Sequence, residues 1–226
     1  MDLTVAQVAG QDQIFVTMLW TVSTQSEQAG QGLLMQYSLD GREQQKWSVF
    51  GRVLAGVAVD AKKGEVYLGD SSNAEILILN LGKGTARTGP QYFARVAGAS
   101  RLGPITLDAE GHRLFAADVE QGKVYVIDLS RRKSALVASG LGEPSALTFS
   151  PTLRTLYVAD AARRCIWQIQ VDTAVPRLKT FSAVTELREP RGLAMRPDNT
   201  LWVADYGARA IFLLSPTGQV IQSIRH

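Results

Sequence analysis

The sequence predicts an all-β fold, a β-propeller of about five four-stranded antiparallel blades. An apolar strand that ends in an acid recurs four times, at Glu65–Asp70, Arg113–Asp118, Thr155–Asp160 and Thr200–Asp205. The acids are spaced 48 (118−70), 42 (160−118) and 45 (205−160) residues apart. A repeat of roughly 20 to 50 residues is typical of solenoids and propellers. Short apolar runs that alternate with a period of two precede each copy, and this period indicates strands.

A fifth, degraded copy of the repeat lies near the N-terminus at Gln13–Met18. Met18 stands where the acid is expected, 52 residues (70−18) before Asp70. Because the blades of a repeat protein pack on their neighbours, we expect the 226 residues to form a single propeller domain. The predicted blades lie at approximately 1–50, 51–98, 99–140, 141–186 and 187–226.

Each repeat divides into four strands. The innermost strands are expected at Gly56–Asp60, Pro104–Asp108, Ala146–Ser150 and Gly192–Arg196. Their alternation places one set of side chains on a buried face, namely Val57/Val59, Ile105/Leu107, Leu147/Phe149 and Leu193/Met195. The second strand is the repeated phrase, whose β-branched and aromatic residues favour a pleated sheet. Third strands are expected at Leu33–Tyr37, Ile76–Asn80, Val124–Leu129, Ile166–Val171 and Ile211–Ser215. Outer strands are expected at Lys46–Phe50, Tyr92–Val96, Ala135–Ala138, Leu178–Phe181 and Gln219–Ile224.

The four repeated acids are interpreted as braces for the loop that follows them. In each copy an aliphatic residue stands six positions after the acid, so the loop between the second and third strands has one length. A carboxylate at the start of such a loop can accept hydrogen bonds from backbone amides a few residues further on. Four equivalent acids around a ring cannot all belong to one active site. We therefore assign a structural, loop-bracing role to Asp70, Asp118, Asp160 and Asp205.

Composition narrows the function classes. The net charge of +3 is mildly basic and includes no basic arm of the kind that binds nucleic acid. The single cysteine, Cys165, has only His112 and His226 as possible partners for nucleophilic catalysis, so we expect it to be structural. No apolar run is long enough for a membrane span. No signal peptide is visible, so the chain could be cytoplasmic, or exported with its signal removed.

Two points stay open in the sequence. The first blade carries a long polar loop, Thr21–Gly32, which is either a partner-binding segment or a plain insertion. The second point is how the ring closes, because the chain begins near an innermost strand and ends on an outermost one. Blades one and five could pack side by side, or Leu3–Val8 could pair at the outer edge of the last blade.

The repeats resemble NHL repeats. The segment Glu189-Pro-Arg-Gly-Leu-Ala-Met, followed by Asn199-Thr-Leu-Trp-Val-Ala-Asp205, is similar to the NHL pattern, and Glu143–Asp160 is nearly as similar. The chain is also distantly similar to the gluconolactonase/regucalcin-like and strictosidine-synthase-like propellers. That resemblance implies a propeller and, for the lactonases, a divalent cation held by Glu, Asn and Asp at the mouths of innermost strands. The matching positions here are Ala55, Gly103, Ser145 and Arg191, and none of them carries a carboxylate or an amide.

The sequence therefore favours a non-enzymatic propeller that binds a protein or a small ligand, possibly anionic, at the loop-lined axial face. No metal and no cofactor are expected. The candidate ligand-binding residues are Arg191, Ser145, Arg101, Arg188, Arg52 and Tyr206. Arginine is chosen because its fixed fork of donors suits carboxylates and phosphates. The alternatives are a divergent metal-dependent lactonase or hydrolase and an RNA-binding propeller. The second is disfavoured because most aromatic residues fall inside strand patterns, as Tyr157 and Trp202 do.

Overall fold

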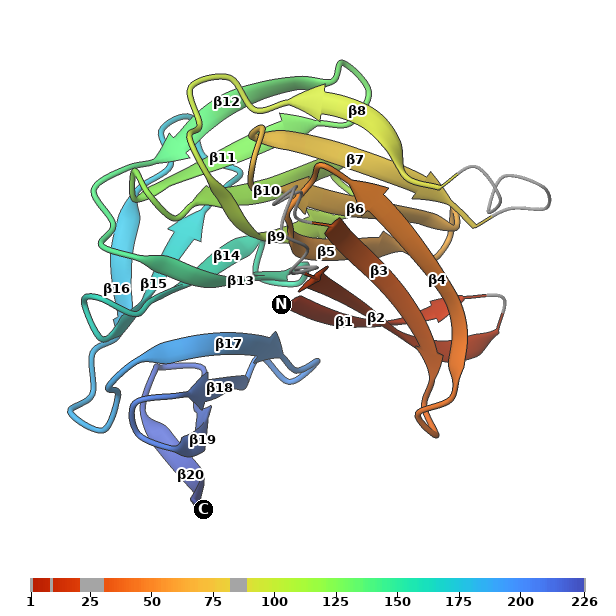
Figure 1. Cartoon of the computed structure of the whole chain (residues 1–226). Coiled ribbons are helices and arrows are strands. Elements are labelled where there is room, and N and C mark those ends of the chain that lie inside the picture. Colours follow the sequence, from red (N-terminus) through yellow and green to blue (C-terminus); the bar gives the residue numbers. More distant parts are fainter. Residues whose placement is uncertain (1, 9, 21–30, 82–88, 226) are drawn as a thin grey trace, which may run out of the picture.

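The computed structural model describes residues 2–8, 10–20, 31–81 and 89–225. These residues form twenty β-strands and no helix, arranged as five four-stranded sheets around a common axis (Figure 1). In each sheet the strands follow in chain order and pair antiparallel. The predicted fold, a propeller of five four-stranded antiparallel blades, is confirmed. No helix in this part of the chain could span a membrane.

The strands of each blade run from the axis outwards. Blade one contains β1 (Asp2–Val8), β2 (Gln11–Trp20), β3 (Gln31–Ser38) and β4 (Glu43–Phe50). Blade two contains β5 (Leu54–Asp60), β6 (Glu65–Asp70), β7 (Glu75–Asn80) and β8 (Gln91–Arg95). Blade three contains β9 (Leu102–Asp108), β10 (Arg113–Asp118), β11 (Lys123–Asp128) and β12 (Lys133–Ala138). Blade four contains β13 (Pro144–Ser150), β14 (Thr155–Asp160), β15 (Cys165–Gln170) and β16 (Leu178–Ser182). Blade five contains β17 (Pro190–Met195), β18 (Leu201–Asp205), β19 (Ala210–Leu214) and β20 (Val220–Arg225).

The repeated acid ends the second strand of blades two to five, and its side chain is buried in each. Asp160 shows the arrangement: it accepts hydrogen bonds from the backbone N–H groups of Gly142 (2.8 Å) and Glu143 (2.9 Å), which precede the innermost strand. It also accepts one from the N–H of Arg163 (3.0 Å), in the loop that follows. Each acid thus joins the entry of its blade to the loop that leaves β6, β10, β14 or β18.

The loops after the four acids share one backbone shape. The fourth residue after the acid has a left-handed conformation in every copy, with φ of 52° at Ala74, 60° at Gly122, 55° at Arg164 and 50° at Arg209. Only glycine adopts this region without strain, yet three of the four positions carry another residue. The hydrogen bonds to the acid stabilise the loop enough to hold that conformation.

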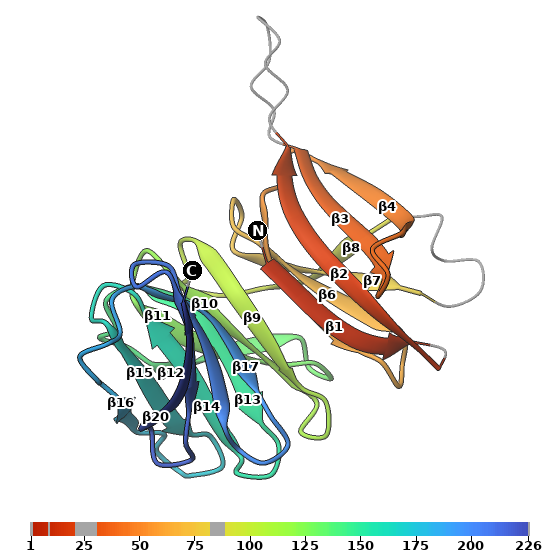
Figure 2. The ribbon, with the colours of Figure 1, turned by 90° about the horizontal axis from the view of Figure 1, so that it is seen from below.

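The core consists of four hydrophobic clusters, each of which joins two neighbouring blades. They lie between blades one and two, two and three, three and four, and four and five. Within the described residues no such cluster joins blade five to blade one, which lie at the two ends of the arc (Figures 1 and 2). Side-by-side packing of blades one and five, one of the two alternatives left open by the sequence, is therefore absent from the core of the described residues.

Two other expectations concern the first blade. The pairing of Leu3–Val8 with the last blade is wrong, because β1 pairs with β2 along its whole length, from Asp2↔Thr17 to Val8↔Gln11. As the innermost strand of its own blade, β1 packs against β5 of blade two. A strand at the outer edge of blade five could not make this contact. Of the long loop Thr21–Gly32, residues 21–30 lie outside the described residues, and Gly32 belongs to β3.

Candidate functional site

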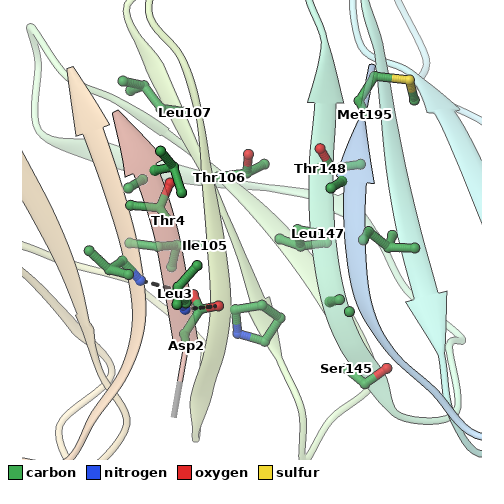
Figure 3. A pocket seen from close by; sticks show the side chains of 18 of the residues that line it. Asp2, Leu3, Thr4, Ile105, Thr106, Leu107, Ser145, Leu147, Thr148 and Met195 are labelled. Atoms are coloured by element: carbon green, nitrogen blue, oxygen red, sulfur yellow. Dashed lines mark hydrogen bonds between the residues drawn. The ribbon is translucent and has the colours of Figure 1, made fainter. Parts of the chain in front are cut away.

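A channel of about 940 Å³ follows the axis, between the innermost strands β1, β5, β9, β13 and β17. Its wall combines aliphatic side chains with the hydroxyl groups of Thr4, Thr106 and Thr148 (Figure 3). Thr106 and Thr148 occupy equivalent positions, two residues before the last residue of β9 and β13. A channel of this size and mixed polarity is typical of small-ligand sites.

One end of the channel, here called the mouth, is shaped by a β-bulge that recurs in blades two to five. In blade four Pro144 pairs with Asp160 and Ala146 pairs with Ala159, so Ser145 has no partner opposite it. The same irregularity leaves one extra residue between Leu54 and Gly56, between Pro190 and Gly192, and within Leu102–Ile105. Bulges of this kind redirect a side chain and are frequent at binding sites. The residues placed in this way include Ala55, Gly103, Ser145 and Arg191, the four positions singled out from the sequence.

Arg191 lines the mouth but is paired with two glutamates. Its Nε and Nη2 donate to Oε1 of Glu189 at 3.0 and 2.7 Å, and its Nη1 donates to Glu143 of the preceding blade. The bond with Glu189, and then the one with Glu143, raise the pKa of Arg191 above its usual value, while partial burial opposes the rise. The three side chains together carry one surplus negative charge. An anionic ligand at Arg191 would therefore have to displace a glutamate.

Ser145 is the second predicted residue at the mouth. Its hydroxyl donates to the carbonyl oxygen of Pro190 at 2.6 Å, which links blade four to blade five. Arg191 and Ser145 both line the channel, so the structure brings these two candidates together.

The other four candidates lie away from the channel wall. Arg52 donates to Asp70 at 2.5 Å and also bonds with Glu75. Arg188 contributes its backbone N–H to Asp205, and the side chain of Arg101 is exposed. Tyr206 is 76% exposed and lines a neighbouring pocket of about 590 Å³ on blade five, which shares Arg191 and Ala204 with the channel.

Asp2 is a residue of the channel that the sequence reasoning missed. One carboxylate oxygen accepts from the N–H of Val57 in blade two (3.0 Å) and the other from the N–H of Leu3 (2.9 Å). Burial raises the pKa of Asp2, and these hydrogen bonds only partly oppose the rise. Asp2 lies at the same end of the channel as Ser145 in Figure 3. Its strand lacks the repeated phrase and its acid, so no local signal marks Asp2 as a residue of the channel.

The residues at the bulged positions do not fit a divalent cation. A hard cation needs several oxygen ligands that converge from different strands, whereas the bulged positions supply a methyl group, a glycine, a hydroxyl and a guanidinium. No group of three or more His, Cys, Asp and Glu side chains with the geometry of a metal site occurs in the described part of the chain.

Comparisons with known structures give the same fold. A chain in the crystal structure of a nidogen/laminin complex superposes with a TM-score of 0.73 at 14% identity, over 99% of this chain and 93% of that one. The luciferin-regenerating enzyme superposes with a TM-score of 0.69 at 14% identity, over 93% of this chain and 80% of that one. Identities this low support the fold alone.

Sequence comparison gives the family. A search of curated proteins finds no significant match. The family profile described as "SMP-30/Gluconolactonase/LRE-like region" matches residues 113–226, that is 114 of 226 residues (226−113+1), just over half of the chain. The predicted resemblance to gluconolactonase-like propellers is confirmed, and this chain belongs to the SMP-30/gluconolactonase/LRE-like family.

Proposed function

We propose that this chain is a non-catalytic member of its family, which binds a small ligand or a protein segment at the mouth of the axial channel. The observation that carries the proposal is the identity of the residues at the bulges. The four bulged positions, Ala55, Gly103, Ser145 and Arg191, carry no carboxylate and no amide side chain that could hold a divalent cation. The site therefore keeps a shape suited to binding without the oxygen ligands that a metal-activated water would require at the bulged positions.

The chemical character of the ligand follows from the residues that line the channel and its mouth. The channel wall offers apolar contact and threonine hydroxyls, so the body of the ligand should be neutral and at least partly apolar. At the mouth, Glu143 and Glu189 flank Arg191, which offers donors and acceptors side by side. A polar group with both a donor and an acceptor, such as an amide or a zwitterion, can bind there without separating the ion pairs.

A ligand screen tests the proposal. The melting temperature of the wild type is measured with a library of amino acids, short peptides and small carboxylic acids. Ligands of the mouth should raise it in the wild type and have little effect in Arg191→Ala and Ser145→Trp. Arg196→Ala is the matched control, because Arg196 follows β17 at the opposite end and pairs only with Asp198 and Thr200 among the described residues.

Metal analysis and lactone hydrolysis complete the test. The family and the luciferin-regenerating enzyme make a divergent metal-dependent hydrolase the alternative function. Stoichiometric divalent metal in the purified protein, together with hydrolysis of gluconolactone that a chelator abolishes, would overturn the proposal. So would a screen in which every stabilising ligand acts equally on the wild type and on both mouth variants.

A further inference from the structure

The turn between the first and second strands of a blade can bond to the blade before it. The residue at the end of this turn has a left-handed backbone in blades three to five, with φ of 49° at His112, 50° at Arg154 and 61° at Asn199. Arg154 donates to Asp108, the last residue of β9, at 3.0 and 2.8 Å. Asn199 accepts from Ser150, the last residue of β13, at 3.1 Å. Side-chain bonds thus bridge two of the blade interfaces at the end opposite the mouth.

The interface between blades two and three lacks this bridge. His112 stands where Arg154 stands in the next blade, as a shared backbone hydrogen bond shows. The N–H of Leu129 donates to the carbonyl oxygen of His112 at 3.0 Å. In the next blade the N–H of Val171 donates to that of Arg154 at 3.3 Å. The last residue of β5 is Asp60, which accepts from N–H groups of its own turn. Within the described residues no hydrogen bond or ion pair joins it to His112.

A second difference leaves this interface without an internal acid. Between blades three and four, the carboxylate of Asp172 pairs with both Arg113 and Arg154. Asp172 stands two positions after the end of β15, and Ser130 stands two positions after the end of β11. A serine therefore occupies, at the interface of blades two and three, the position from which a carboxylate closes the next one.

A groove of about 400 Å³ lies at the unbridged interface, between two blades that are neighbours in the ring (Figure 1). Of the charged side chains that line it, two are cationic and one is anionic, which leaves one surplus positive charge with the histidine neutral. The lining residues on which the argument depends are Lys63, Glu65 and Tyr92 of blade two and His112, Ser130 and Arg132 of blade three.

Arg132 is the cation of the groove that is open to a ligand. Its guanidinium lies over the ring of Phe93 in blade two, 4.8 Å from the ring centre. Arg132 forms no ion pair within the described part of the chain, whereas Lys63 lies 3.7 Å from Asp60. Stacking on an aromatic ring holds a guanidinium in place and leaves the N–H groups at its edge free to donate to a carboxylate.

The groove also offers groups that can bond a hydroxyl. One carboxylate oxygen of Glu65 accepts from the hydroxyl of Tyr67 at 2.8 Å, and the other is available as an acceptor. Ser130 and Tyr92 add hydroxyl groups to the wall, and Tyr92 is 56% exposed. A ligand that carries both a carboxylate and a hydroxyl therefore finds a partner for each.

We infer that the groove between blades two and three is a second binding site, which holds a small hydroxy carboxylate. The carboxylate pairs with Arg132, beside Lys63 and His112, and supplies the negative charge that Asp172 supplies at the next interface. The hydroxyl of the ligand donates to Glu65. The site lies at the end opposite the mouth, so it is independent of the ligand proposed for the channel.

Nuclear magnetic resonance on the full chain tests the inference. Lactate is titrated at constant ionic strength, and lactamide is the control probe because it keeps the hydroxyl but lacks the charge. Lactate should shift the amide signals of His112, Ser130 and Arg132, and lactamide should not. Arg132→Gln should weaken lactate binding at least about tenfold. Arg131→Gln is the matched control, because Arg131 is the neighbouring exposed arginine but lies outside the lining.

Three further variants make the test specific. Ser130→Asp supplies the carboxylate from within the chain, so it should pair with Arg132 and weaken lactate binding at least about tenfold. Ser130→Asn has the same shape without the charge and should keep the binding. Arg191→Ala changes the mouth and should bind lactate in the groove as the wild type does.

Four results would overturn the inference. The first is a titration in which lactate shifts none of the amide signals of the groove, and the second is one in which lactamide shifts them equally. The third is a loss of affinity in Arg131→Gln as large as that in Arg132→Gln, because general surface charge would then explain the binding. The fourth is undiminished binding of lactate by Ser130→Asp.

Discussion

Asp160→Ala should remove much of the stability of blade four. The carboxylate is fully buried and accepts four hydrogen bonds, from the N–H groups of Gly142, Glu143 and Arg163 and from Nε1 of Trp167, at 2.8 to 3.0 Å. A hydrogen bond to a charged group contributes about 1.5–3 kcal/mol, and a buried donor left without a partner costs about 1–3 kcal/mol. Gly142 and Arg163 are exposed, so water can replace the carboxylate for some of these donors. We expect a loss of about 3–5 kcal/mol in the free energy of unfolding.

Urea unfolding followed by far-ultraviolet circular dichroism measures this loss. Tryptophan fluorescence is unsuitable, since Trp167 itself contacts Asp160. Asp160→Asn keeps one acceptor oxygen, so its free energy of unfolding should fall by less than that of Asp160→Ala, about 1–3 kcal/mol. Asp198→Ala is the control, because Asp198 bonds Thr200 in an exposed turn and should contribute little. An unchanged urea midpoint in Asp160→Ala, or a greater loss in Asp160→Asn, would refute the bracing role.

Three further predictions concern acid pH, one glycine and the cysteine. Burial opposes ionisation of Asp70 and Asp160, but their hydrogen-bond donors outweigh it and hold both pKa values below 3.8. A depressed pKa gives stabilisation that is present above the unfolded value and lost as the pH falls through the folded one. In thermal melts, the melting temperature should fall between about pH 5 and pH 2. The melting temperature of Asp160→Asn should depend less on pH. Gly122→Ala should destabilise more than Gly140→Ala in urea melts: both residues have a positive φ, but only at Gly122 would an added Cβ overlap a backbone carbonyl. Burial raises the pKa of Cys165 to about 11, so Ellman's reagent at pH 8 should react only as fast as the protein unfolds, and rapid labelling of the native protein would contradict this.

Much of the fold could be predicted because its signals are local. The phrase that ends in Asp70, Asp118, Asp160 and Asp205 marks the second strand, and the fixed distance to Ile76 or Ile166 marks the third. These patterns depend on residues within one blade. The first blade was harder to predict, because the sequence of β1 (Asp2–Val8) alternates but contains neither the repeated phrase nor its acid. Its pairing with β2 is visible only in three dimensions.

The candidate site was less predictable because its contacts cross between blades. Arg191 and Ser145 could be placed at the mouth from the spacing of the repeat. That Arg191 would pair with Glu143, 48 residues earlier, depends on how blades four and five meet. The same holds for Asp2, which bonds Val57, 55 residues away. Hydrogen bonds between residues so distant leave no pattern in a single sequence.

A second network of this kind joins blades three and four at the opposite end. Arg154 donates to both oxygens of the buried Asp108, at 3.0 and 2.8 Å, and to Asp172 at 2.6 Å. Arg113 bonds the same two acids. The bonds from Arg154 reach 46 residues back along the chain to Asp108.

The buried acids of the four loops also bear on how the number of blades in such a protein can change. Within the described residues, Asp70, Asp118, Asp160 and Asp205 each accept hydrogen bonds only from their own blade. When a gene segment that encodes one blade is duplicated or deleted, none of these carboxylates loses its donors to the rearrangement. Insertion or removal of one whole blade therefore leaves the remaining members of this set of four buried carboxylates with their hydrogen-bond donors.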